Sequence, residues 1–101
     1  MLSGRRFADL IERQLALFRE DYADLVAECT AAERAYDRSG RDEAEERYAE
    51  YLELVEKGTD ALAGIRDAYA STLDPADAEA YEAAFNRAVS RHLPRFAIGL
   101  D

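Results

Sequence analysis

Two matching stripes of apolar residues constrain the fold of this chain more than any other feature. In each stripe, apolar or semi-apolar side chains recur at alternating steps of three and four, which is the spacing of a helical heptad seam. The first stripe runs through positions 8, 11, 15, 18, 22, 25, 29, 32 and 36, and the second through positions 44, 48, 51, 55, 58, 62, 65, 69 and 72. Two long helices with seams of equal length are expected to pack against each other.

The segment between the stripes favours a tight reversal of the chain. Gly40 suits the position just past a helix C-terminus, and Asp42 with Glu45 has the spacing of a capping box at a helix N-terminus. We therefore predict a long antiparallel, coiled-coil-like hairpin with helices over about residues 7–38 and 42–72.

Residues equidistant from Gly40 should meet across this hairpin, and the sequence then places large side chains opposite small ones. Ala32 lies opposite Tyr48, and Tyr22 lies opposite Gly58. Close packing favours such complementary layers. Because glycine costs about 1 kcal/mol relative to alanine inside a helix, we interpret Gly58 as space for the Tyr22 ring.

A shorter third helix is predicted by the strongest local signal in the chain. Asp74 has the character of an N-cap, and Pro75 suits the first helical position. This helix should extend over about residues 75–92 and end before Pro94. The tail over residues 94–101 carries apolar side chains at alternate positions, namely Phe96, Ile98 and Leu100. Since the third helix is shorter than the hairpin, we expect three helices at the open end and two at the turn.

Composition indicates one all-α domain over residues 1–101, with 49% hydrophobic residues to form a core. The net charge of −9 would repel phosphate backbones and anionic lipids, so neither nucleic acid nor a membrane is expected as a partner. The single cysteine, Cys29, cannot form an internal disulfide, and no apolar run is long enough to span a bilayer. We therefore predict a cytoplasmic protein.

Residues with catalytic or metal-binding chemistry are sparse. The one histidine, His92, has no carboxylate three or four residues before it, and one histidine with one cysteine cannot form a zinc ligand set. We predict no catalytic residue, no metal and no cofactor.

One group of residues is a weak candidate for a ligand site. Tyr36, Tyr48 and Tyr51 gather with Cys29 near the turn, where only two helices are expected. A buried tyrosine hydroxyl needs a hydrogen-bond partner. This group could therefore form a polar pocket, a dimer contact or an ordinary part of the hydrophobic core. Core tyrosines whose hydroxyls reach the edge of the seam are favoured.

These patterns favour a non-catalytic helical interaction or structural module that self-associates, with a dimer favoured. Its tail packs on its own fold or is offered to an outside protein partner. The alternative is a small helical enzyme or ligand-binding protein that uses the tyrosine-rich end of the hairpin or the acidic face of the second helix. The candidate interface residues are Phe96, Ile98, Leu100, Tyr36 and Tyr48.

Overall fold

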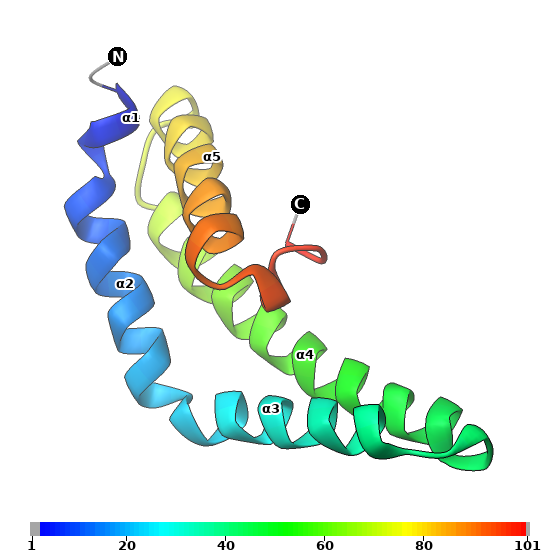
Figure 1. Cartoon of the computed structure of the whole chain (residues 1–101). Coiled ribbons are helices and arrows are strands. Elements are labelled where there is room, and N and C mark those ends of the chain that lie inside the picture. Colours follow the sequence, from blue (N-terminus) through cyan, green and yellow to red (C-terminus); the bar gives the residue numbers. More distant parts are fainter. Residues whose placement is uncertain (1–2, 101) are drawn as a thin grey trace.

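The computed structural model describes residues 3–100, and within them the regular secondary structure is entirely helical (Figure 1). The predicted all-α class is confirmed. The elements are the short helix α1 (Ser3–Arg6), the helices α2 (Ala8–Asp21), α3 (Ala23–Arg38), α4 (Arg41–Ala70) and α5 (Pro75–His92), and the 3-10 helix η1 (Pro94–Phe96).

The helix expected over residues 7–38 is divided at Tyr22 into α2 and α3. Tyr22 has φ −113° and ψ 27°, outside the α-helical range. The hydrogen bonds nevertheless continue, because the Tyr22 N–H donates to the carbonyl of Phe18 over 2.9 Å and the Val26 N–H donates to the carbonyl of Tyr22 over 3.0 Å. The chain therefore bends here without leaving these backbone groups unpaired.

The bend separates the molecule into two regions that differ in the number of packed helices. Beyond it, α3 and α4 lie side by side, whereas α2 diverges from α4, and α5 packs against both (Figure 1). We call residues 23–57 the arm, and residues 3–21 with 58–100 the three-helix end. The whole molecule is elongated, with extents of 50 × 23 × 22 Å.

The expected pairing of Gly58 with Tyr22 is wrong, because Gly58 faces the ring of Phe96. A Cβ atom added to Gly58 would collide with the ring of Phe96. Tyr22 is exposed and stacks on Phe18, with 5.1 Å between the ring centroids. Since α2 diverges from α4, the tail ring occupies the space that the seam pattern assigned to Tyr22.

The core lies almost wholly in the three-helix end. Its rings meet edge to face, with 5.4 Å between the centroids of Phe7 and Tyr81 and 5.7 Å between those of Phe18 and Phe96. The Phe18–Phe96 contact joins α2 to the tail. The buried apolar residues are Phe7, Ile11, Leu15, Phe18, Leu62, Ala70, Tyr81, Ala84, Phe85, Val89, Phe96 and Leu100 of the three-helix end, and Cys29 of the arm.

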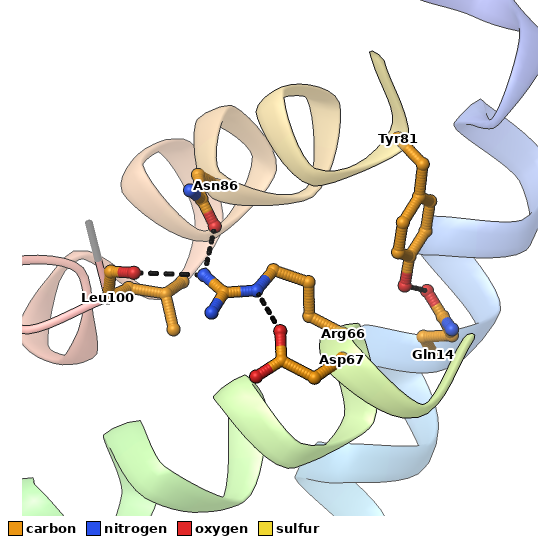
Figure 2. Close-up of polar contacts among 6 residues, drawn as sticks. All are labelled: Gln14, Arg66, Asp67, Tyr81, Asn86 and Leu100. Atoms are coloured by element: carbon orange, nitrogen blue, oxygen red, sulfur yellow. Dashed lines mark hydrogen bonds and ion pairs between the residues drawn. The ribbon is translucent and has the colours of Figure 1, made fainter. Parts of the chain in front are cut away.

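Polar contacts fix the tail against α4 and α5. Nη1 of Arg66 donates to the carbonyl of Leu100 over 2.9 Å and to Oδ1 of Asn86 over 3.0 Å, while its Nε donates to Oδ1 of Asp67 over 2.9 Å (Figure 2). Oγ1 of Thr59 donates to the carbonyl of Phe96 over 3.1 Å. The tail is thus held by hydrogen bonds as well as by its buried rings.

Among the described residues, no helix combines the length and the apolar character needed to cross a membrane.

Candidate functional site

The structure brings the three predicted tyrosines together as a row of rings on the arm. The ring centroids of Tyr36 and Tyr48 are 5.2 Å apart, and those of Tyr48 and Tyr51 are 6.3 Å apart. Tyr36 and Tyr48 are 38% and 45% exposed. The row is therefore a surface of aromatic rings, not the interior of a core.

Arg95 connects this row to the tail. Its guanidinium carbon lies 5.9 Å from the centroid of the Tyr51 ring, a cation–π arrangement, and its Nη2 forms an ion pair with Oε1 of Glu33 over 2.9 Å. Tyr51 is therefore engaged within the chain, which leaves Tyr36 and Tyr48 as the more available members of the row.

Cys29, the fourth residue of the predicted group, is fully buried. Burial raises the pKa of its thiol, because desolvation disfavours the thiolate. Cys29 therefore stays protonated at neutral pH and packs as a small apolar side chain. No group of three or more His, Cys, Asp or Glu side chains that could hold a metal ion occurs among the described residues.

The tail residues predicted at an interface have different environments. Phe96 and Leu100 are buried in the core of their own chain, while Ile98 is 93% exposed. Of the three tail residues predicted at an interface, Ile98 alone is exposed to a partner.

A groove between α2 and α5 is the feature that sequence reasoning missed. It encloses about 470 Å³, and no residue of α4 lines it. Its floor contains the buried residues Ile11, Leu15 and Ala84. The lining residues are Ala8, Ile11, Glu12, Leu15, Arg19, Ala84, Arg87, Ala88, Arg91 and His92. We call this feature the α2–α5 groove.

The rim of the α2–α5 groove is basic, although the chain has a net charge of −9. Arg19, Arg87 and Arg91 line it, with Glu12 as the one acidic lining residue. Nη2 of Arg19 donates to the carbonyl of His92 over 3.2 Å, at the C-terminus of α5. Arg87 and Arg91 form no ion pair with any residue that the structure describes.

Guanidinium groups above an apolar floor suit the binding of carboxylates carried on an apolar surface. The sequence shows that Arg87 and Arg91 are one helical turn apart, but it does not show that α2 brings Arg19 beside them.

Comparison with protein-family models, curated proteins and solved structures gave no match for this chain. Its function is therefore inferred from its own residues.

Proposed function

We propose that the protein is a non-catalytic helical interaction module that associates with further copies of itself, most simply as a dimer. The observation that supports this is an apolar patch on the arm, formed by Tyr36, Tyr48 and Leu52. Leu52 is 45% exposed and lies one turn after Tyr48 on α4. We call these three residues the arm patch.

The arm is the part of the molecule with the least internal support. Only Cys29 among its apolar side chains is fully buried, since two helices alone enclose little volume. Tyrosine is enriched where proteins meet, because its ring buries a large area and its hydroxyl keeps a polar contact. A second copy that covers the arm patch would provide the missing layer.

A small-molecule site is less well supported by the same residues. Such sites usually surround about 70–90% of the ligand surface, whereas Tyr36 and Tyr48 are both more than one third exposed on the arm. The acidic face of α4 has the same open character, with Glu53, Glu56 and Asp60 all exposed. A binding partner of the size of a protein fits these surfaces better.

The other functional expectations are part of the same proposal. The net charge of −9 disfavours nucleic acid and anionic membranes as partners. The free, buried thiol of Cys29 is compatible with a reducing compartment such as the cytoplasm.

Sedimentation velocity over a micromolar to millimolar concentration series tests the proposed self-association. We expect the weight-average mass to rise with concentration, and we expect Leu52→Ser to shift this rise to higher concentration. Leu17→Ser is the matched control, because Leu17 is 56% exposed but lies on α2, away from the arm patch. A wild-type protein that stays monomeric throughout the series refutes the proposal.

A further inference from the structure

The outer face of α4 in the arm combines apolar and acidic side chains. Ala49, Leu52, Glu53, Glu56 and Asp60 are all exposed. Ala49, Glu53, Glu56 and Asp60 recur at steps of three to four, which places them on one helical face, and Leu52 lies beside that face, three residues after Ala49. Glu53 and Glu56 form no ion pair among the described residues. This face therefore presents an apolar side chain beside free carboxylates.

The α2–α5 groove has the complementary arrangement. Its floor is apolar, and two of its floor positions, Ala84 and Ala88, have small side chains. Its rim carries Arg87 and Arg91, which are four residues apart, while Glu53 and Glu56 are three apart, so each pair lies on one helical face. The opposite charges of the two pairs favour contact between the two surfaces.

Helices that bind in grooves place apolar anchors on the floor and charged residues along the rim. The outer face of α4 has both, with Leu52 as the anchor and Glu53 with Glu56 as the charged residues. A copy of α4 therefore has the chemistry that the groove requires.

The arm and the pair α2 and α5 lie toward opposite ends of a molecule 50 Å long (Figure 1). An antiparallel neighbour therefore places its arm level with the groove along this long axis. If each copy of a pair both gives and receives this contact, the pair has two-fold symmetry and closes at a dimer. A parallel arrangement would place the acidic faces of the arms together, which like-charge repulsion disfavours.

We propose that the α2–α5 groove of each copy binds the outer face of α4 from the other copy in an antiparallel dimer. This rests on the proposed self-association and identifies the two surfaces that meet. Guanidinium groups of Arg87 and Arg91 pair with the carboxylates of Glu53 and Glu56, and Leu52 lies on the apolar floor.

A charge exchange between two variants tests this docking. Arg87→Glu with Arg91→Glu makes an acidic groove, and Glu53→Arg with Glu56→Arg makes a basic arm. Each variant alone places like charges together, so we expect its dimer dissociation constant, measured by sedimentation, to rise about tenfold or more. An equimolar mixture restores both contacts, because each altered surface then meets its opposite. The mixture should therefore form a heterodimer about as tightly as the wild type forms a homodimer.

A matched control separates the site from the change in total charge. Arg34→Glu with Arg38→Glu changes the net charge by the same amount as the groove variant Arg87→Glu with Arg91→Glu. It has the same helical spacing, but its positions are exposed on α3. We expect this control to retain wild-type association. Far-UV circular dichroism and the melting temperature of each variant show whether it is folded, and the rescue in the mixture requires both variants to be folded.

The outcomes distinguish the docking from the proposed function. If Leu52→Ser weakens association but the mixture of charge variants does not associate, the self-association stands and the docking into the α2–α5 groove is refuted. A Kd that is unchanged in both charge variants also refutes the docking. Open polymers in place of dimers at high concentration contradict the antiparallel closure.

Discussion

The arm and the three-helix end share the helix α4, but the three-helix end buries its aromatic rings whereas the arm leaves two of its rings exposed. At the three-helix end, the rings of Phe18, Tyr81 and Phe96 are buried among one another and their neighbours. On the arm, Tyr36 and Tyr48 remain more than one third exposed. The difference follows from α5 and the tail, which cover only one end of α4.

This comparison shows where the free energy of folding should be concentrated. A third layer multiplies the apolar area removed from water, and each large side chain contributes about 1.5–3 kcal/mol when fully buried. The three-helix end should therefore determine the stability of the monomer. The arm is free to retain exposed apolar side chains, because side chains that stay exposed contribute little to the stability of the monomer.

Removing the tail ring should have the largest effect. Phe96→Ala leaves a cavity between α2 and α4, and such substitutions cost about 3–5 kcal/mol. Chemical denaturation gives the change in the free energy of unfolding. Ile98→Ala is the control in the same tail, and it should change this free energy very little because Ile98 is 93% exposed. Equal effects at the two positions would contradict burial of the tail.

Alkaline pH should weaken the three-helix end specifically. Burial raises the pKa of Tyr81 to about 12. The Tyr81 hydroxyl donates a hydrogen bond to Oε1 of Gln14 over 2.9 Å (Figure 2). An unfolded tyrosine has a pKa of about 10. The folded state therefore holds this proton more tightly, so its contribution is complete below about pH 10 and is lost as the pH rises toward 12, up to about 2–3 kcal/mol.

Tyr81→Phe isolates this effect, because it removes the titrating group and keeps the ring. We expect the melting temperature of the wild type to fall more steeply than that of Tyr81→Phe between about pH 10 and about pH 12. Parallel curves would show that Tyr81 does not titrate differently on folding.

Two glycines of α4 give a smaller contrast with opposite signs. Gly58→Ala adds a methyl group that collides with the buried ring of Phe96, and overpacking of this kind costs about 1–3 kcal/mol. Gly64→Ala meets no atom within 4 Å, so the higher helix propensity of alanine should stabilise the protein by about 1 kcal/mol. Thermal unfolding of both variants tests this. A stabilising Gly58→Ala would mean that Phe96 is not packed on Gly58.

The smallest effect is expected on the arm. Tyr48→Ser removes the ring contact with Tyr36, and aromatic pairs contribute about 0.5–1.5 kcal/mol beyond their buried area. A double-mutant cycle with Tyr36→Ser, performed at concentrations where the protein is monomeric, should give a coupling energy at the lower end of that range. A coupling of several kcal/mol would show that the arm is as well packed as the three-helix end.

The sequence predicts the helical elements because their signals are local. The periodic stripes identify the helical segments, and Asp74 with Pro75 identifies the start of α5 from hydrogen bonding and backbone geometry alone. The Asp74 carboxylate accepts from the N–H of Asp77 over 3.0 Å, as an N-cap does. Such signals require no knowledge of distant residues.

The bend and the α2–α5 groove could not be predicted in this way. The stripe continues through Tyr22 without proline or glycine, and the bend coincides with the contact between Phe18 and the distant ring of Phe96. The groove depends on Arg19 meeting the end of α5, a contact across 73 residues. Periodicity describes the face of one helix, but it does not describe which distant segment covers that face.

The long-range contacts of the three-helix end have a consequence for folding kinetics. Contacts that close the three-helix end join residues far apart in the chain, with separations of 67 for Gln14 and Tyr81 and 71 for Arg6 and Asp77. The arm needs only the short reversal at Gly40, and closing a short loop costs less entropy than closing a long one. We expect the arm to form first in the transition state and to bring the two ends of the chain together, so φ-values should be high for Ala→Gly substitutions in the arm and near zero for Phe96→Leu. The region that contributes least to stability would then set the speed at which the rest can fold.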